Sequence, residues 1–542
     1  MSRPMLTRRH ALSALALSMT FPVLAACEDG DDSTTSSTQH EEESATPEED
    51  SGAIKRNGNE AIPATYLTDA SELMVPKAIK VDTKVMNLNV TYAVGPAVTD
   101  ERGTLVRLAW TVNGAFIKDT WVDYQTNYWL RGRDFNSDGA YTGTDCRLIN
   151  LGTGKIAEST SSLPEDSADA DNVNALAVTF PAMEGDTFAF ILPTYGLIEN
   201  IPVVAAADAG FDVNAAWKAA GFDGKGEVIA DMIPFTEAPE GESSSVVDGN
   251  RVTINLGSDV FFDVDSSTLS PAAINSLKKL SDSLDQYGGG TMTITGHTDS
   301  VGDDAHNQEL SVARAQAVAD QLGKDTDLNA FNVIIEGKGS SKPAVQETDD
   351  ASRAANRRVE IVIDANKTPT SAPVIASGTD LPAAPALAAP MGTPLTLKTY
   401  HDGTLKFEVL GARRVGKYVV VDYGTTGVTS TGGGAMVYTA FNSTGVRYPT
   451  DLSSNTETAA PIALLTAEER EYPLAYMRTS KSHAYATDML PTLGLRTDEY
   501  YRFSSLYTDK DGDELIIDMN QEPNEYTDYV APFRVTGVKV TG

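Results

Sequence analysis

Residues 296–302 read Gly-His-Thr-Asp-Ser-Val-Gly and directly follow the alternating stretch Met292–Thr295. Alternation of apolar and polar residues predicts a strand, so the glycine-bounded segment is expected to be a polar loop at its carboxyl end. Beyond the loop, apolar residues recur at helical spacing, which predicts an amphipathic helix. These apolar positions are Leu310, Ala313, Ala317 and Val318.

The segments on both sides complete one small fold. Ser270 followed by Pro271 favours a helix start, and the glycines at 288–290 favour its end. The apolar stripe of this helix is Ile274, Leu277, Leu280 and Leu284. Further strands are expected at residues 252–256, 331–336 and 358–363. Residues 251–366 are therefore predicted to form an α+β domain, a β-α-β-α-β-β mixed sheet covered by helices.

Three blocks of sequence within this domain follow a known pattern in the same order. They are Gly296–Gly302, Asn307–Ala315 and Asn356–Ile361. Residues 251–366, about a fifth of the chain, thus resemble the OmpA-like peptidoglycan-binding domain. That family includes the C-terminal domain of OmpA and the peptidoglycan-associated lipoproteins. The resemblance implies that this domain binds peptidoglycan.

The resemblance also implies which residues bind the ligand. Family members hold the free end of diaminopimelate in uncrosslinked stem peptides, and the matching positions here are Asp299 and Arg314. This free end carries an ammonium and a carboxylate on one carbon. A carboxylate such as Asp299 accepts hydrogen bonds from the ammonium. A guanidinium such as Arg314 clamps the carboxylate through two bonds, which lysine does not.

Three further residues are expected at this site. Asn307 lies seven residues before Arg314 and on the same helical face, where its amide can orient the ligand or the loop. Leu310 is expected to contact the methylene stem of the ligand. The resemblance implies that Arg357 reaches the ligand carboxylate.

Each site residue also has a purely structural alternative. Asp299 and Arg314 could form only an ion pair with each other. Asn307 could be a helix cap, and Leu310 could be a core residue. The arginine pair at 357–358 could serve mostly to pair acidic residues at the edge of the sheet.

The N-terminus has the features of an exported lipoprotein. Arginines precede an apolar run, Ala11–Ala26, shorter than the roughly 20 residues that span a bilayer, so 1–26 is expected to be a signal peptide. The run ends Leu-Ala-Ala before Cys27, which resembles a lipobox. Cys27 is therefore expected to be acylated and to anchor the chain to a bacterial membrane; a chance cysteine is the alternative. Arg8-Arg9 also resembles a twin-arginine export signal.

The rest of the chain divides into a tether, two β-rich regions and a linker. Residues 27–61 are acidic and poor in apolar residues, which predicts an extended spacer or a mere exposed leader. Residues 62–236 and 396–542 carry alternating runs separated by turns, which predicts antiparallel sandwiches. Residues 367–395 are rich in proline and alanine and are expected to be a linker.

The two β-rich regions look related to each other. Each contains a Phe-Asn-Ser-x-Gly turn, at 135–139 and 441–445, and each has a Gly-Asp step into a strand, at 185–186 and 512–513. They resemble the immunoglobulin-like sandwich modules of bacterial lipoproteins. All-β, immunoglobulin-like flanking domains are therefore expected, and other envelope proteins are partners that they could bind.

One turn in the first β-rich region has an acidic pattern. Its residues match positions 1, 3, 5, 6 and 12 of a calcium-binding loop. They are Asp134, Asn136, Asp138, Gly139 and Asp145. Because the twelfth residue is not the bidentate Glu and strands are expected on both sides, a polar hairpin turn is the preferred interpretation and no metal is expected.

Composition argues against several other classes of protein. The formal net charge of −34 repels phosphates, so nucleic acid is not expected as a partner. Two cysteines are too few for a disulfide framework. The six histidines have no zinc-protease spacing, and no Gly-x-Ser-x-Gly elbow stands at a strand-to-helix turn.

The sequence thus predicts a non-catalytic, lipid-anchored protein of the cell envelope, without a cofactor, that tethers a membrane to peptidoglycan. The membrane is either the outer membrane or the outer face of the plasma membrane. The alternative is a wall-localised enzyme, or a receptor for a small ligand, with its activity in a flanking β-rich region.

Overall fold

The computed structural model describes most of the chain from Ile54 onward, in ranges separated by gaps. These ranges are 54–56, 60–62, 65–66, 77–85, 88–112, 117–118, 146–160, 175–220, 229–369, 373, 375, 380–398, 403–429, 462–479, 482–486, 497–520 and 531–542. Cys27, the acidic pattern at 134–145 and the two Phe-Asn-Ser turns lie outside the described residues. Their roles stay predictions.

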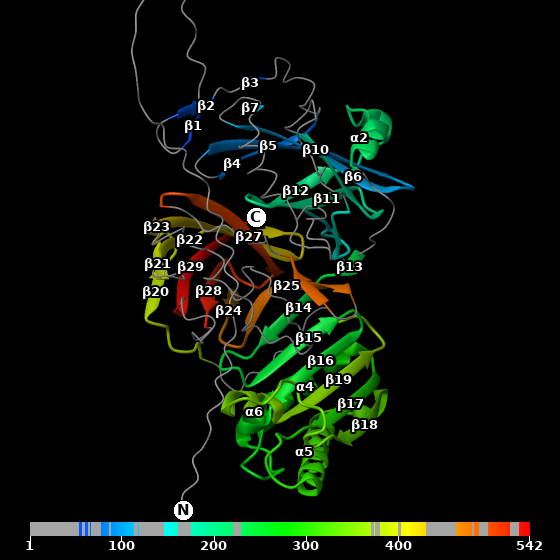
Figure 1. The fold of residues 1–542 in the computed structure, drawn as a ribbon. Helices are drawn as coiled ribbons and strands as arrows, with labels where there is room; N and C mark the ends of the chain where they lie inside the picture. The colour runs from blue at the N-terminus through cyan, green and yellow to red at the C-terminus, as the bar shows by residue number, and fades with distance from the viewer. Residues whose placement is uncertain are drawn as a thin grey trace, which may run out of the picture. The chain divides into compact units, whose positions relative to one another are not determined.

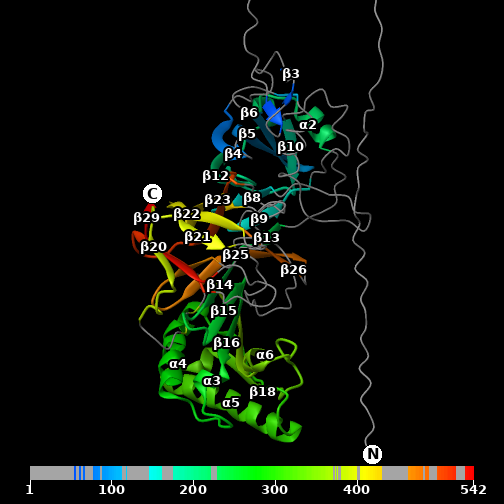
Figure 2. The same cartoon turned by 60° about the vertical axis from the view of Figure 1, so that its left-hand side comes forward.

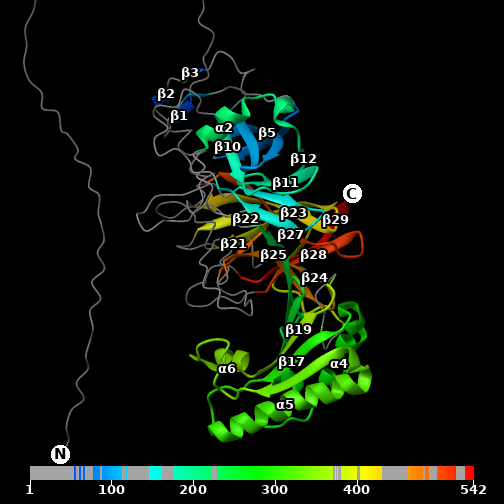
Figure 3. The ribbon, with the colours of Figure 1, turned by 90° about the vertical axis from the view of Figure 1, so that its right-hand side faces the viewer.

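The segment from Arg251 to Ala365 forms a mixed sheet with helices packed on one face (Figures 1 and 3). The strands are β16 (Arg251–Gly257), β17 (Gly290–Gly296), β18 (Phe331–Gly337) and β19 (Arg358–Ala365). Their order is β18-β17-β19-β16, with β17 and β18 parallel and the other pairs antiparallel. The helices are α3 (Ser258–Phe261), α4 (Pro271–Ser283), α5 (Asp304–Asp325) and α6 (Asp350–Asn356), with 3-10 turns η4 (Leu284–Tyr287) and η5 (Leu328–Ala330).

The predicted α+β order of this segment is confirmed, and α6 is an addition before the last strand. Ser270 caps α4 as expected, because its side chain accepts a hydrogen bond of 3.1 Å from the N–H of Ala273. One apolar core joins the sheet to α4 and α5, and burial of each large side chain contributes about 1.5–3 kcal/mol. Its buried members include Ile254, Leu277, Leu280, Met292, Ile294, Val318, Leu322 and Ile361.

The buried face of α5 differs from the predicted stripe. Val318 is buried as expected, but Leu310, Ala313 and Ala317 are only half-buried. The buried residues instead are Asn307, Ser311, Arg314, Ala315, Val318, Ala319, Gln321 and Leu322. The helix packs closely on two strand-end glycines: a Cβ atom on Gly296 would collide with the Ser311 carbonyl oxygen. Because of this close approach, α5 turns a partly polar face toward the sheet. The spacing of apolar residues could not predict this.

A hairpin extends this sheet into the C-terminal β-rich region (Figure 2). It consists of β14 (Ile233–Glu237) and β15 (Ser243–Asp248). β15 pairs with β16, and β14 pairs antiparallel with β25 (Arg470–Thr479). The ladder hydrogen bonds of one sheet therefore run from the α+β segment into the β-rich part of the chain.

Most strand pairs in both β-rich regions are antiparallel, as predicted, but the strand Phe533–Thr541 pairs in parallel with two strands of the second region. The first has β4 (Ile79–Val85), β5 (Leu88–Asp100), β6 (Gly103–Val112), β8 (Arg147–Asn150), β9 (Lys155–Glu158), β10 (Ala175–Phe180), β11 (Thr187–Leu192), β12 (Gly196–Pro202) and β13 (Ile229–Asp231). It also has β3 (Thr65–Tyr66), β7 (Ile117–Lys118), η3 (Ala206–Asp208) and α2 (Val213–Ala219). A separate pair of strands, β1 (Ile54–Arg56) and β2 (Glu60–Ile62), lies at the end of the stretch predicted to be a tether. The longer strands form two sheets, β10-β6-β5-β4 and β12-β11-β8-β9-β13.

The second β-rich region continues the sheet that begins at β18. Besides β25 it has β20 (Leu387–Pro390), β21 (Leu395–Lys398), β22 (Thr404–Val415), β23 (Tyr418–Thr429), β24 (Ala463–Leu465), β26 (Ser482–Tyr485), β27 (Tyr500–Thr508), β28 (Glu514–Met519) and β29 (Phe533–Thr541). The Gly-Asp steps at 185–186 and 512–513 lead into β11 and β28, as expected. The immunoglobulin-like resemblance of both regions stays a prediction.

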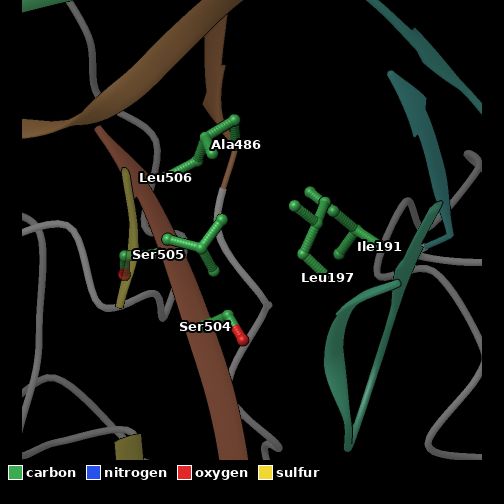
Figure 4. A pocket seen from close by; sticks show the side chains of 7 residues that line it. Ile191, Leu197, Ala486, Ser504, Ser505 and Leu506 are labelled. Atoms are coloured by element: carbon green, nitrogen blue, oxygen red, sulfur yellow. The ribbon is translucent and has the colours of Figure 1, made fainter. Parts of the chain in front are cut away.

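The two β-rich regions share an apolar core. Side chains of β8, β9, β11 and β12 pack with side chains of β22, β23, β25, β26 and β27. Figure 4 shows a small cavity at this junction, where Ile191 and Leu197 face Ala486 and Leu506. Tyr476 adds a polar link, since its hydroxyl accepts from Arg147 Nε at 2.9 Å and donates to Glu158 Oε1 at 2.5 Å. The regions are therefore packed together and not merely joined through the chain.

The stretch predicted as a linker contacts folded parts along its described residues. The carbonyl oxygens of Pro373 and Ile375 accept hydrogen bonds from Ser245 and Ser243 of β15. The Ile375 side chain is buried in the core of the α+β segment. Farther on, β20 pairs in parallel with β29.

A buried ionic cluster joins several of these pieces. Asp518 is 1% exposed, and its carboxylate accepts from Arg470 Nε at 2.9 Å and from Arg534 Nε at 2.8 Å. Arg534 also donates to the carbonyl oxygen of Pro382 in the linker stretch, at 2.8 Å. Arg470 donates to the carbonyl oxygen of Pro239, in the turn between β14 and β15. A single carboxylate thus balances two buried guanidinium groups.

We expect Asp518→Ala to lower the free energy of unfolding by about 3–5 kcal/mol, because it leaves two buried cations without their counter-charge. Denaturant unfolding of the full chain measures this change. Asp511→Ala is the control, since this exposed aspartate of the neighbouring turn should change stability by no more than about 0.5 kcal/mol. Equal stability of the two variants would contradict the assignment.

Candidate functional site

The predicted site residues come from three elements that meet at the carboxyl end of β17. Asp299 lies in the loop that connects β17 to α5, and Arg314 lies in the middle of α5. Arg357 lies between α6 and β19, which is the strand beside β17. The fold therefore gathers residues that are far apart in the sequence, as the resemblance implied.

Asp299 is nearly buried, with 9% of its surface exposed. Its Oδ1 accepts a hydrogen bond of 3.1 Å from the N–H of Val301, which fixes the carboxylate against its own loop. Its Oδ2 accepts a hydrogen bond of 2.6 Å from Arg357 Nη1. The carboxylate is thus oriented from two sides.

Arg357 binds two carboxylates at once. Its Nε donates to Asp259 Oδ1 at 2.7 Å and its Nη2 donates to Asp259 Oδ2 at 2.5 Å, a bidentate pair. Hydrogen bonds to Asp259 and then to Asp299 raise the pKa of Arg357 above its usual value. Arg357 thus pairs acidic residues, as the structural alternative proposed, whereas the neighbouring Arg358 donates to the carbonyl oxygens of Asn356 and Lys342. Contact with a ligand stays a prediction.

Arg314 is held differently. Its Nε donates to the carbonyl oxygen of Ser266 at 2.9 Å, and its guanidinium carbon lies 5.2 Å from the centroid of the Phe262 ring. Only 4% of its surface is exposed, and this burial lowers its pKa, although a guanidinium remains charged at neutral pH. Within the described part of the chain, neither Nη atom has a hydrogen-bond acceptor. Arg314 is thus a largely buried cation whose two Nη groups have no protein acceptor among the described residues.

The Asp299–Arg314 ion pair, which was the structural alternative, does not form between these two described residues. Asp299 is paired with Arg357 instead. The carboxylates of Asp259, Asp265 and Asp299 nevertheless lie near enough to raise the pKa of Arg314 against the effect of burial. Arg314 therefore keeps its donors available in an acidic surrounding.

Asn307 orients the loop. It is 4% exposed, and its Nδ2 donates to the carbonyl oxygen of Val301 at 3.0 Å. The helix-cap alternative is wrong, because Asp303 caps α5 by accepting from the N–H groups of Ala305 and His306. Leu310 is half-buried, so its contact with a ligand stays a prediction.

Sequence reasoning missed several residues that support the site. Glu347 braces the loop, since it accepts from the N–H of Ser300 at 3.0 Å and from its Oγ at 2.5 Å. Asn356, part of the third sequence block, donates to Glu347 Oε1 at 3.0 Å. Asp259 and Phe262 were also missed, because nothing in their spacing along the sequence relates them to Arg357 and Arg314.

His297, in the same loop as Asp299, is buried. Burial, followed by the charges of Arg358 and Lys338, lowers the pKa of His297 to about 3, so this imidazole is uncharged at neutral pH. Among the residues that the structure describes, no cluster of three His, Cys, Asp or Glu side chains could hold a metal ion. The described helices also include none long and apolar enough to cross a membrane.

Comparison with known proteins assigns this part of the chain to a family. Residues 261–357 match the model of the OmpA family. Outer membrane porin F of Pseudomonas aeruginosa is 36% identical over 134 residues, which cover 24% of this chain and 38% of porin F. Outer-membrane lipoprotein YfiB of the same species is 34% identical over 110 residues, which cover 20% of this chain and 65% of YfiB.

The solved structure of the cell wall anchor of the T6SS from Pseudomonas aeruginosa is 32% identical to this chain, with a TM-score of 0.20. The match covers 21% of this chain and 82% of that one. The chain spans only 38% and 65% of the two curated relatives, and neither of them is named as an enzyme. Residues 261–357 of this chain form an OmpA-family domain.

Proposed function

We propose that this chain is a non-catalytic protein of the bacterial cell envelope that binds peptidoglycan through its OmpA-family domain. In this proposal the acylated Cys27 anchors the chain to a membrane, and the domain holds the free end of diaminopimelate in a stem peptide. The protein thereby tethers the membrane to the wall. The similarity to an outer-membrane lipoprotein supports the lipid anchor.

The free Nη groups of Arg314 carry the proposal. A buried guanidinium needs acceptors for its donors, and in this protein only its Nε has one among the described residues. A ligand carboxylate would accept from both Nη atoms in a bidentate pair. Asp299, fixed by Val301 and Arg357, offers an acceptor for the ammonium on the same ligand carbon.

We expect Asp299→Ala and Arg314→Ala each to weaken binding of a diaminopimelate-containing stem peptide by at least about tenfold. The reason is that a charge-assisted hydrogen bond contributes about 1.5–3 kcal/mol. Arg314→Lys keeps the charge but loses the fork, so it should restore binding only in part. The double alanine variant should lose less binding free energy than the two single variants lose in sum, because both residues act on one ligand group.

Calorimetric titration of the full chain measures these affinities, with circular dichroism to verify folding. Gln316→Ala is the control, since this exposed residue of α5 donates to Asp320 on the same helix. The proposal fails if both alanine variants bind as the parent does. It also fails if a lysine-type stem peptide, which lacks the second carboxylate, binds the parent equally well.

The β-rich regions are expected to add no wall binding of their own. The full chain should therefore sediment with insoluble peptidoglycan, and the Asp299→Ala, Arg314→Ala double variant should stay in the supernatant. If the double variant still sediments, the wall contact lies in a β-rich region. Clearing of a peptidoglycan zymogram by the parent would instead support the alternative of a wall-localised enzyme.

The lipid anchor depends on one thiol. We expect Cys27→Ala to abolish partition of the protein into the detergent phase, because no other side chain of the leader can form the thioether. The precursor should also remain uncleaved or be released in soluble form. Normal detergent partition of the variant would show that the anchor lies elsewhere.

A further inference from the structure

The arrangement around Arg357 assigns a role to Asp259, which lies at residue two of the short helix α3. We propose that Asp259 and Arg357 set the ligand selectivity of the site. Asp259 holds Arg357, and Arg357 orients Asp299 and offsets its charge, so that a zwitterionic ligand end is preferred over a lone ammonium. This inference rests on the proposed function.

The geometry separates the tasks of the two arginines. Three nitrogen atoms of Arg357 already donate to protein carboxylates, through Nε and Nη2 to Asp259 and through Nη1 to Asp299. Arg314 has only its Nε engaged within the described chain. Arg314 therefore has its two Nη donors available for a ligand carboxylate, and Arg357 is a positioning residue. This differs from the expectation that Arg357 reaches the ligand.

The exposed fraction of the side chain falls from Asp259 through Arg357 to Asp299. The side chain of Asp259 is 51% exposed, that of Arg357 is 27% exposed and that of Asp299 is 12% exposed. The bidentate pair with Asp259 thus holds Arg357 from the solvent side, while Nη1 reaches inward to Asp299. Without Asp259, Arg357 would keep one contact and lose the fork that fixes its direction.

The charges of the four residues balance. Asp259 and Asp299 supply two negative charges, and Arg314 and Arg357 supply two positive charges. Asp265 also acts on Arg314, but its carboxylate is paired with His306 at 2.6 Å, a contact that raises the pKa of the imidazole. A zwitterionic ligand end adds no net charge to this set. A lone ammonium adds an uncompensated charge to a partly desolvated site, where such an imbalance costs more than in water. Removal of Arg357 leaves the set negative, which favours a cation.

A competing account is that Asp259 and Arg357 form only a surface ion pair, which contributes little in most proteins. The two accounts differ in what Asp259→Ala does to binding. A surface pair predicts no effect on the ligand. A positioning role predicts an effect that disappears once Arg357 is gone, because Asp259 acts only through it.

The test uses the full chain and two stem peptides, one with diaminopimelate and one with lysine at the third position. Affinities are measured by calorimetric titration for the parent, Asp259→Ala, Arg357→Ala, Arg357→Lys and the Asp259→Ala, Arg357→Ala double variant. Asp263→Ala is the matched control, since it removes the same charge from an exposed carboxylate four residues away. Asp259 is exposed enough that its replacement should leave folding intact.

We expect Asp259→Ala to weaken binding of the diaminopimelate peptide by about threefold to tenfold, and Asp263→Ala to leave it unchanged. The double variant should bind as Arg357→Ala does. Arg357→Ala should lower the ratio of diaminopimelate to lysine affinity by at least about fivefold, whereas Arg357→Lys should keep that ratio while losing affinity.

The inference is overturned if Asp259→Ala binds as the control does, if the double variant shows the full added cost of both changes, or if Arg357→Ala leaves the affinity ratio unchanged. In these cases the parent still binds the diaminopimelate peptide and the proposed function stands. Absence of binding by the parent itself would overturn both.

Discussion

Burial of the Arg314 guanidinium is the constraint on which the arrangement of the OmpA-family domain depends. Taking a cation out of water is unfavourable unless acceptors and a suitable surface replace the lost solvent. The loop after Phe262 supplies the carbonyl oxygen of Ser266 and the ring face. The close contact of α5 with the glycine ends of β17 and β18 brings the arginine to that loop. The two Nη groups are left without a protein acceptor among the described residues.

Much of this domain could be predicted from the sequence, because its signals are local. The Ser270 cap, the alternating strand before Gly296 and the ordered motif blocks each specify a short segment. The partners of the charged side chains could not be predicted in this way. Asp259 and Arg357 are 98 residues apart, and only the pairing of β16 with β19 brings them together. The partly polar buried face of α5 could not be predicted for a related reason. Its contacts with glycines of the neighbouring strands produce no periodic pattern of apolar residues in the helix.

In the β-rich regions, too, the sequence predicted the strands but not the elements that they contact. Alternating runs identified strands in both, but alternation does not say which sheets pack together. In the structure Ile191 and Leu197 of the first region enter a core with Val420 and Leu506 of the second. The β14–β25 ladder and the buried Asp518 cluster connect this body to the OmpA-family domain. A domain joined by a continuous ladder is held more firmly than one on a flexible linker.

The central claim is that the free donors of Arg314 bind a ligand carboxylate. The most direct measurement compares two stem peptides that differ in one group, the free carboxylate at the end of diaminopimelate and its amide. Amidation removes the charge and one acceptor oxygen but keeps the ammonium for Asp299. The account predicts that the full chain binds the amidated peptide at least about tenfold more weakly. Equal affinity for the two peptides would contradict it.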